Sequence, residues 1–318
     1  MDQEVLLFKE AWGLSQMALL KETARAFLAN LSKTTAKCYE SEVSAFLSFV
    51  TTNFPITSPR ELRRNHIIFY KTQLEKNGLS NKTILKKLSA ISSFCKFLAG
   101  ENLVEKDIAY GIKRPRTENK KETADLSDKD VRSLFEKMKK EGAYYIHHRA
   151  LLAVGFYTGL RSSEIRNLKL ESYAKVDGHI ILRCIIKGGK VHEIPLNPFV
   201  VRCLDEHIEK LKVLGFDLNP EHYLFPSIKT KQNKPIQAKA LWEIFQNRLK
   251  DAGIELSSVR RYSPHSMRAT LAGHLLNTVE APLEHVQHAL GHSSPTTTMK
   301  YNKRKTHHDK SPVYKIDY

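Results

Sequence analysis

The sequence has few cysteines, and they are not paired. Four thiols stand far apart, at Cys38, Cys95, Cys184 and Cys203, with no CxxC motif among them. This scatter argues against a disulfide framework and offers no thiolate pair for a structural zinc site. Free thiols are typical of a protein in a reducing cytoplasm.

Long apolar runs are missing as well. No run approaches the ~18–20 residues that a membrane span needs. The first ten residues, MDQEVLLFKE, carry early acidic residues and have no signal-peptide pattern. We therefore expect no membrane partner and a cytoplasmic location.

Acidic residues are outnumbered by basic ones. The chain has 51 Lys and Arg against 34 Asp and Glu, a net charge of +17, and its pI is near 9.6. Such an excess predicts a polyanionic partner, and nucleic acid is a more common one than an acidic membrane surface. The alternative is a basic surface without any such partner.

At 318 residues, the chain is long enough for about two domains of ~150 residues each. Apolar residues recur at spacings of three and four in 34–50, 61–78 and 81–100, which predicts three amphipathic helices. Gly78 is a suitable stop for the second, and Ser80 a suitable N-cap for the third.

A polar, basic segment, KRPRTENKKETAD, interrupts this pattern at residues 113–125 and is typical of a linker. We place the domain boundary there. The expected organisation is an N-terminal extension over 1–15, a helical domain over 16–112, the linker over 113–125, a second domain over 126–305 and a tail over 306–318.

The second domain contains a strand-rich insert, HIILRCIIKGGKVHEIPL, at residues 179–196. Two β-rich runs flank Gly188-Gly189, which predicts a hairpin with a two-residue turn and places Lys187 and Lys190 on either side of its tip. Helical patterns surround the insert. The expected fold class is mainly α with a small β-hairpin insert (α+β).

Besides the hairpin with Lys187, three motifs could carry chemistry, and the first is TGLRSSEIRNL. Gly159 breaks a helix there, and Ser162 can cap the next one, with Glu164 in its first turn. Arg161 lies in the turn, where its guanidinium could bind a phosphate. The alternative is a structural ion pair between Arg161 and Glu164.

The second motif is SPHSMRATLAGHLL. Ser263 can cap a helix that begins at Pro264, which places His265 and Arg268 on one face of its first turns. This pair could hold and protonate a phosphoryl oxygen near the helix N-terminus. The alternative is two unrelated surface residues.

The third motif is LGHSSPTTTMKYNKRK, Leu290 to Lys305. Gly291 ends one helix, Ser294-Pro295 begins another, and Tyr301 falls on its last turn among four basic residues. A free tyrosine has a pKa of ~10 and is a poor nucleophile at neutral pH. Nearby cations favour its phenolate and shield a phosphate that it attacks. The pattern indicates a nucleophilic tyrosine.

A histidine cluster offers a competing interpretation. His285, His288 and His292 have spacings found among metal ligands. There is no HExxH motif and no cysteine pair nearby, and Gly291 ends the helix before His292. We therefore predict neither a metal site nor a cofactor.

Five features follow one another along the chain: the arginine, the hairpin lysine, HxxR, LGH and a tyrosine nine residues after the LGH histidine. This ordered set resembles the tyrosine recombinases of the phage-integrase and Xer-like family. The resemblance covers nearly the whole chain. It implies an N-terminal helical (SAM-like) core-binding domain and a catalytic domain. Two departures are Ala269, where the family often has histidine, and MKYNK around the tyrosine in place of IYTH. The 1–15 extension is expected to leave no room for the arm-binding domain of some phage integrases.

The resemblance implies a role for each matching residue. Tyr301 would attack a DNA phosphodiester, forming a 3′-phosphotyrosyl link and releasing a 5′-hydroxyl. Arg161 and Arg268 would clamp the phosphate. His265 would handle the proton of the nucleophile. Neither metal nor ATP is needed, because the covalent link stores the bond.

Two further catalytic roles follow from the same resemblance. Lys187 would protonate the leaving 5′-oxygen, and His292 would hydrogen-bond to the scissile phosphate. Lys190, Lys82 and Lys86 are expected to contact DNA, although Lys82 and Lys86 also fit an ordinary solvated helix face.

The expected partner is double-stranded DNA, and the expected assembly is a homotetramer on two DNA sites or a heterotetramer with a partner recombinase. The tail over 306–318 is expected to dock on a neighbouring subunit, and the protein to lie on the nucleoid when it binds DNA. Two alternatives are a DNA-binding regulator of the same fold that does not cleave, and a topoisomerase that relaxes supercoils.

Overall fold

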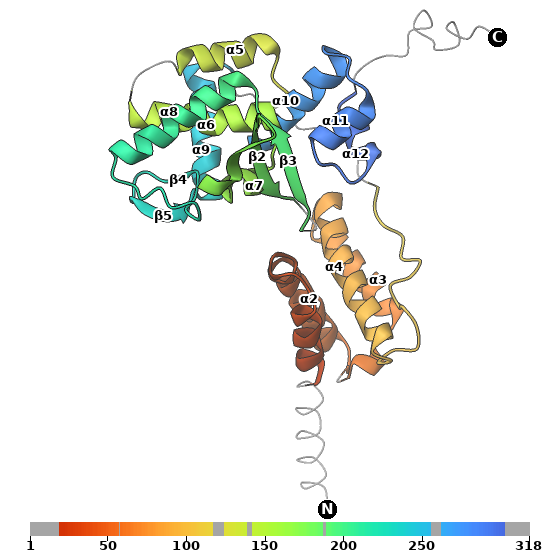
Figure 1. The fold of residues 1–318 in the computed structure, drawn as a ribbon. Helices are drawn as coiled ribbons and strands as arrows, with labels where there is room; N and C mark the ends of the chain where they lie inside the picture. The colour runs from red at the N-terminus through yellow and green to blue at the C-terminus, as the bar shows by residue number, and fades with distance from the viewer. Residues whose placement is uncertain are drawn as a thin grey trace, which may run out of the picture. The chain divides into compact units, whose positions relative to one another are not determined.

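The chain forms two compact units, Met1–Lys120 and Lys121–Tyr318 (Figure 1). The computed structural model describes residues 19–56, 58–116, 124–138, 142–186, 189–255 and 262–302. Helices dominate both units and the strands form two small antiparallel sheets, so the predicted fold class is confirmed. None of the described helices is long and apolar enough to cross a membrane.

The first unit is helical. Residues 19–29 form its first described helix. The later elements are α2 (Lys33–Asn53), the 3₁₀ turn η1 (Pro59–Glu61), α3 (Arg64–Lys76) and α4 (Asn81–Gly100). Ser80 caps α4 by accepting from the Thr83 N–H, and Gly78 adopts φ +71° just after α3, both as predicted. The apolar stripes of these helices share one core, which includes the fully buried Phe46, Ile84 and Phe94.

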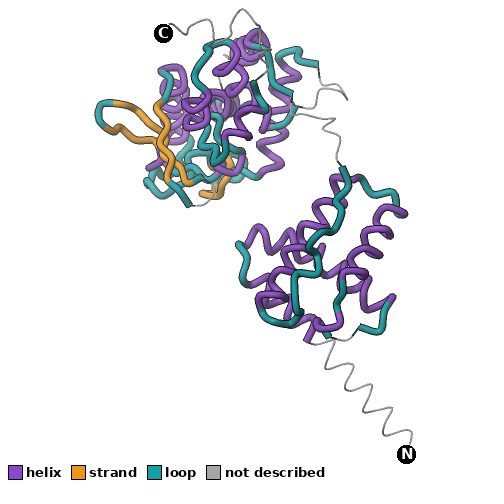
Figure 2. The backbone as a smooth tube through the Cα atoms, turned by 90° about the vertical axis from the view of Figure 1, so that its right-hand side faces the viewer, coloured by secondary structure: helices purple, strands orange, loops and turns teal. Residues whose placement is uncertain are grey.

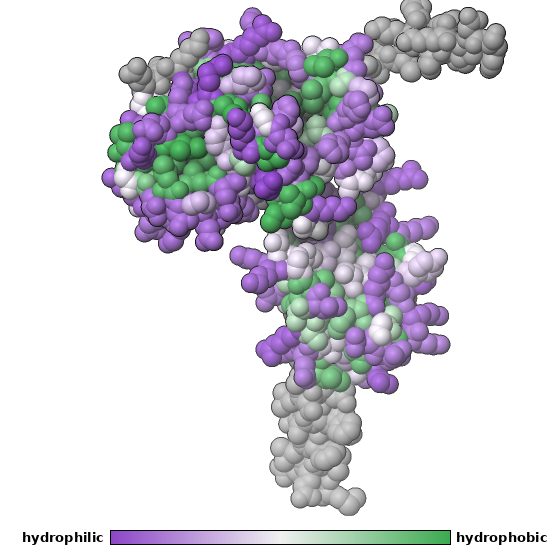
Figure 3. Space-filling view, in the orientation of Figure 1, coloured by the Kyte–Doolittle hydropathy of each residue, from purple (hydrophilic) through white to green (hydrophobic). Residues whose placement is uncertain are grey.

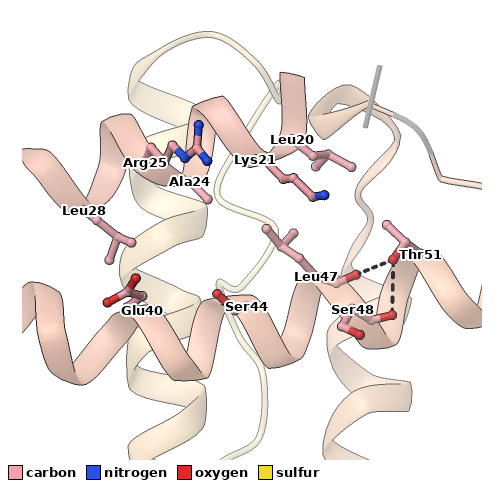
Figure 4. A pocket seen from close by; sticks show the side chains of 10 residues that line it. All are labelled: Leu20, Lys21, Ala24, Arg25, Leu28, Glu40, Ser44, Leu47, Ser48 and Thr51. Carbon is pink, nitrogen blue, oxygen red and sulfur yellow. Dashed lines mark hydrogen bonds between the residues drawn. The ribbon is translucent and has the colours of Figure 1, made fainter. Parts of the chain in front are cut away.

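A pocket of about 440 Å³ lies between the helix at 19–29 and α2. Figure 4 shows Leu28 and Leu47 directed into it, with Lys21, Arg25 and Glu40 at its margin. The pocket belongs to the N-terminal unit alone.

The start of the expected linker is attached to α4. The Arg114 guanidinium donates to the hydroxyls of Ser89 and Ser92, each at 3.2 Å. The Asn81 side chain donates to the Arg116 carbonyl at 2.8 Å. Residues up to 116 therefore pack against the helical unit, and the domain limits drawn from the sequence stay a prediction.

The second unit contains the remaining elements. Its helices are α5 (Asp128–Lys137), α6 (Ala143–Thr158), α7 (Ser162–Arg166), η2 (Leu170–Ser172), α8 (Pro198–Val213), α9 (Ala238–Asp251), α10 (Pro264–Asn277), α11 (Leu283–Ala289) and α12 (Pro295–Met299). Its strands are β1 (Tyr173–Val176), β2 (His179–Ile185), β3 (Val191–Pro195), β4 (Pro226–Ser227) and β5 (Gln232–Pro235). Ser127 caps α5 by accepting from the Asp130 N–H.

Strands β1, β2 and β3 form an antiparallel meander, and Figure 2 shows the strands (orange) extending beyond the helices. The last register pair of β2 and β3 is Ile185 with Val191. The Ile186 N–H then donates to the Lys190 carbonyl at 2.9 Å, and the Gly189 N–H donates to the Ile186 carbonyl at 3.1 Å.

The predicted two-residue turn is therefore wrong. Lys190 pairs with Ile186, so the connection is longer by one residue than a turn with Gly188-Gly189 at its centre. Gly189 does adopt φ +76°, as in three-residue hairpin loops that end in a left-handed glycine. Lys187 and Gly188 lie outside the described residues.

Helices α6 and α10 cross closely, and this crossing positions the site. A Cβ at Gly155 would clash with the Met267 sulfur, and a Cβ at Gly159 would lie 3.1 Å from Leu271 Cδ2. Gly159 also needs its φ of +64°, which strains any side chain. The two glycines let the C-terminal end of α6 approach the first turns of α10, which carry Arg268.

Two histidines are buried side by side in the core of the second unit. The ring centroids of His147 and His207 are 4.9 Å apart, and His207 Nε2 donates to the Leu224 carbonyl at 2.8 Å. The Nδ1 atoms of both rings have no hydrogen-bond partner among the described residues. Burial lowers the pKa of His207 to about 4 and that of His147 well below its ordinary value.

These histidines predict acid sensitivity. The folded chain excludes a proton that each imidazole accepts in the unfolded chain below pH ~6.5, so stability falls as pH drops from about 6.5 towards 4. His207 alone should contribute about 1.4 kcal/mol per pH unit in that window. Urea unfolding between pH 7 and pH 5 should show a shallower pH dependence in His207→Gln, which keeps the donor to Leu224. His179→Leu, at an exposed position, is the matched control, and an unchanged slope in His207→Gln would contradict the prediction.

Candidate active site

Arg268 lies at the centre of the predicted site and is almost fully buried, at 1% exposure. Its two terminal nitrogens donate to the Gly159 and Leu290 carbonyls, each at 2.6 Å, and its Nε donates to His292 Nε2 at 3.2 Å. Both carbonyls are at helix C-terminal ends, where acceptors lack intrahelical donors. One N–H on each terminal nitrogen has no partner among the described residues. Burial and the nearby Arg161 lower the pKa of Arg268 to about 10, so it stays charged at neutral pH.

His292 connects Arg268 to the segment that carries Tyr301. Burial and the arginine cations lower the pKa of His292 to about 4, so the ring is neutral at pH 7. Since Nε2 accepts from Arg268, the proton resides on Nδ1, which lies 2.8 Å from Thr298 Oγ1 and donates to it. Thr298 is fully buried on α12.

Tyr301 lies two residues after the end of α12. The sequence placed it on the last turn of that helix, but α12 ends at Met299 and the Tyr301 N–H donates to the Thr298 carbonyl. Its ring stacks on His292, with centroids 6.3 Å apart and planes within 9°. It also packs against a small apolar cluster from α10 and α11, and α11 lies beside α12 (Figure 1). The hydroxyl lies 3.3 Å from His265 Nε2.

The electrostatics of Tyr301 differ from the expectation. Burial raises the pKa of Tyr301, and the lowering by Arg268 and Arg161 only partly offsets it. The cations therefore do not make the free phenol a phenolate. Burial and the same two arginines lower the pKa of His265, so its imidazole is neutral at pH 7 and able to accept the phenolic proton.

Arg161 joins this cluster from the start of α7. The prediction that Ser162 caps this helix is wrong, because Arg161 itself has the extended N-cap conformation. The buried Glu164 carboxylate accepts from the Arg161 N–H and from its guanidinium, both at 2.7 Å. The ion pair that was the structural alternative is thus present, and it orients the arginine beside the other groups.

The structure therefore brings together five of the six predicted catalytic residues, from α7, α10 and the turns around α12: Arg161, His265, Arg268, His292 and Tyr301. Lys187 lies outside the described residues. Among the described residues, no three His, Cys, Asp or Glu side chains form a group that could hold a metal ion.

The predicted DNA-contact lysines lie on the surface. Lys82 and Lys190 are exposed. Lys86 is exposed but its ammonium pairs with Glu42 Oε1 at 3.0 Å, and Lys87 holds the other oxygen of that buried carboxylate. A phosphate would therefore compete with Glu42 for Lys86.

The supporting roles of three residues in the site were not predicted from the sequence. Glu164 orients Arg161, Thr298 accepts from His292, and His192 of β3 bonds to the Ala289 carbonyl. Glu164 had a readable signal, since an acid three residues after an N-cap is a capping pattern. Thr298 sits in a threonine run with nothing to distinguish it, and the contact of His192 joins residues 97 positions apart.

We expect Thr298→Val to slow the DNA cleavage predicted for Tyr301 about tenfold and to destabilise the unit by about 1–3 kcal/mol. Valine keeps the shape, but the buried Nδ1–H of His292 then loses its acceptor. Thr297→Val, exposed on the same helix, is the control. Urea unfolding and the rate of covalent DNA capture check both effects, and wild-type behaviour of the Thr298 variant in both would contradict the prediction.

Comparison with known proteins identifies the family of this chain. Residues 124–308 match the model of the phage integrase family, and residues 27–102 match the phage integrase N-terminal SAM-like domain. Tyrosine recombinase XerD of Listeria innocua is 27% identical over 272 residues, which cover 85% of this chain and 88% of that protein.

Two solved structures share the fold. One is the XerH site-specific recombinase bound to palindromic difH substrate in a post-cleavage complex. Its TM-score is 0.71 at 18% identity, and the match covers 99% of this chain and 90% of that one. The other is a lambda integrase tetramer bound to a Holliday junction. Its TM-score is 0.66 at 15% identity, with coverage of 91% and 78%.

A helical unit that matches the SAM-like domain, followed by a unit that matches the phage integrase model, defines an enzyme that breaks and rejoins DNA. The chain belongs to the phage integrase family of tyrosine recombinases. It is a site-specific recombinase that acts on DNA.

Proposed function

We propose that Tyr301 cleaves one DNA strand by attacking a phosphodiester, with His265 as the acceptor of its proton. The observation that carries the proposal is the 3.3 Å distance between Tyr301 Oη and a neutral His265 Nε2. The new bond joins Oη to phosphorus, and the P–O5′ bond breaks. The products are a 3′-phosphotyrosyl link and a 5′-hydroxyl.

The arginines stabilise the charge that develops on the phosphate. Arg268 retains one N–H on each terminal nitrogen, and the Arg161 guanidinium, oriented by Glu164, is one-third exposed. Charged donors of this kind are each worth on the order of 10²–10³ in rate. His292 hydrogen-bonds to the phosphate once Arg268 has released its Nε2 and that nitrogen carries a proton. Lys187 gives the proton to the leaving 5′-oxygen.

The assembly that performs recombination is a tetramer on two DNA sites, either of identical chains or with a partner recombinase. The lambda integrase tetramer on a Holliday junction, which has the same fold, supports this proposal. Residues 306–318 dock on a neighbouring subunit. Lys82, Lys86 and Lys190 contact DNA phosphates, and the enzyme works on cytoplasmic, nucleoid DNA as an Xer-like or mobile-element recombinase.

Covalent capture tests the proposed chemistry. The wild-type protein is incubated in EDTA with fragments that flank its own gene, and SDS-resistant protein–DNA complexes are isolated. After proteolysis, mass spectrometry identifies the tyrosine linked to DNA. We expect the peptide that contains Tyr301. A link through another tyrosine would overturn the assignment, and tight selective binding with no link would favour the regulator that does not cleave.

Relaxation of a supercoiled plasmid separates the remaining alternative. A recombinase should join two sites from different duplexes and show a rate that depends on both. A topoisomerase should relax any supercoiled plasmid as a monomer, without requiring a second site. Efficient relaxation of plasmids that lack the captured site would favour the topoisomerase.

A further inference from the structure

Among the described residues, one face of the end of the β2–β3 hairpin contacts the turn that follows α11, which carries Leu290, Gly291 and His292. On the outer face, Ile185 and Val191 form a cross-strand pair and are 71% and 62% exposed. Figure 3 shows an apolar patch (green) where the two strands end. On the inner face, Ile186 is partly buried and His192 is 8% exposed.

The inner face contacts the turn that follows α11. Gly291 has no side chain there, and a Cβ at this position would lie 3.2 Å from Ile186 Cδ1 and 3.5 Å from the His192 ring. His192 Nε2 lies 3.1 Å from the Ala289 carbonyl. Because a carbonyl only accepts, the histidine nitrogen is the donor.

The Ala289 carbonyl is next to an anchor of the active site. It lies at the C-terminal end of α11, and the following carbonyl, of Leu290, accepts from Arg268. Two adjacent peptide groups thus receive a donor from the hairpin and a donor from the phosphate-binding arginine. His292 follows two residues later in the same turn.

We infer that His192 is a positioning residue, which holds the β2–β3 hairpin beside the scissile phosphate so that the leaving 5′-oxygen receives its proton. This inference rests on the proposed function, in which Lys187, the residue after Ile186 in the sequence, is the proton donor. The Tyr301 oxygen–phosphorus bond forms, the P–O5′ bond breaks and the 5′-oxygen takes the proton. His192 itself touches none of these atoms.

The test uses the full chain with His192→Ala, His192→Gln and His179→Ala. Glutamine places an amide donor near the position of Nε2, so it should preserve the bond to Ala289. His179, exposed at the other end of β2, is the matched control. In the free protein, hydrogen exchange at the Ile186 and Gly189 amides should be at least about tenfold faster in His192→Ala and unchanged in the other two.

Cleavage is then measured in single turnover on a duplex that carries the mapped cut position. One duplex has the ordinary 5′-oxygen, and the other has a bridging 5′-sulfur, which leaves as a thiolate without needing a proton. We expect His192→Ala to slow cleavage of the oxygen duplex about 10²-fold at unchanged DNA affinity, as a displacement of about 1 Å does. It should cleave the sulfur duplex at the wild-type rate, and His192→Gln should cleave both normally.

A merely structural role would slow both duplexes equally, and that result would overturn the inference. So would hydrogen exchange that is unchanged in His192→Ala, whatever the DNA result. A wild-type protein that captures neither duplex would instead overturn the proposed function, while hydrogen exchange still decides whether His192 tethers the hairpin.

Discussion

Tyr301→Phe should bind DNA with wild-type affinity and form no covalent link to it. Phenylalanine keeps the ring that stacks on His292 and packs against the α10–α11 cluster, so the fold and the DNA surface should be preserved. Only the hydroxyl beside His265 is lost. Removal of a nucleophile from a unit of cooperating residues costs up to about 10⁶ in rate, so capture should fall below detection.

The measurement pairs SDS-resistant capture with binding to the same labelled fragment. Tyr144→Phe is the control, because Tyr144 is 56% exposed in the same unit and lies outside the cluster. A covalent link that persists in Tyr301→Phe would identify a different nucleophile. Loss of both binding and capture would contradict the prediction, because it would show that the hydroxyl of Tyr301 contributes to DNA affinity.

Arg268→Ala should abolish cleavage and destabilise the catalytic unit by about 3–5 kcal/mol. The guanidinium satisfies two carbonyls at the ends of α6 and α11 as well as His292, and each buried acceptor left unpaired costs about 1–3 kcal/mol. The cavity left by the side chain adds to that loss. Relief of the buried charge acts in the opposite direction.

Arg268→Lys separates chemistry from folding. Lysine keeps the charge but cannot reach both carbonyls and a phosphate with one ammonium, so cleavage should still fall by at least about 10²-fold. Arg166→Ala is the control, since Arg166 also donates to a main-chain carbonyl, that of Ile236, at 2.5 Å. Thermal unfolding and single-turnover capture provide the two measurements. Wild-type cleavage by a folded Arg268→Lys would remove Arg268 from the proposed phosphate site.

Local signals in the sequence were sufficient for some helix limits. Ser80 and Gly78 act at the positions predicted for them, because caps and left-handed stops depend only on neighbouring main-chain groups. The predicted cap at Ser162 is wrong, because Arg161 is the N-cap and its N–H donates to the Glu164 carboxylate. The predicted length of the hairpin turn is wrong, because the length depends on the strand register. The hydrogen bond between Ile186 and Lys190 sets that register.

The sequence by itself determined the candidate chemical groups, since their order along the chain carries the family resemblance. Tertiary structure decided what those groups do to one another. Gly159 meets Arg268 across 109 residues because α6 and α10 cross at glycines. The direction of the Tyr301 pKa also depended on packing, because burial against α10 and α11 outweighs the two arginines. Counting the basic residues near Tyr301 in the sequence does not reveal how far folding removes its hydroxyl from water.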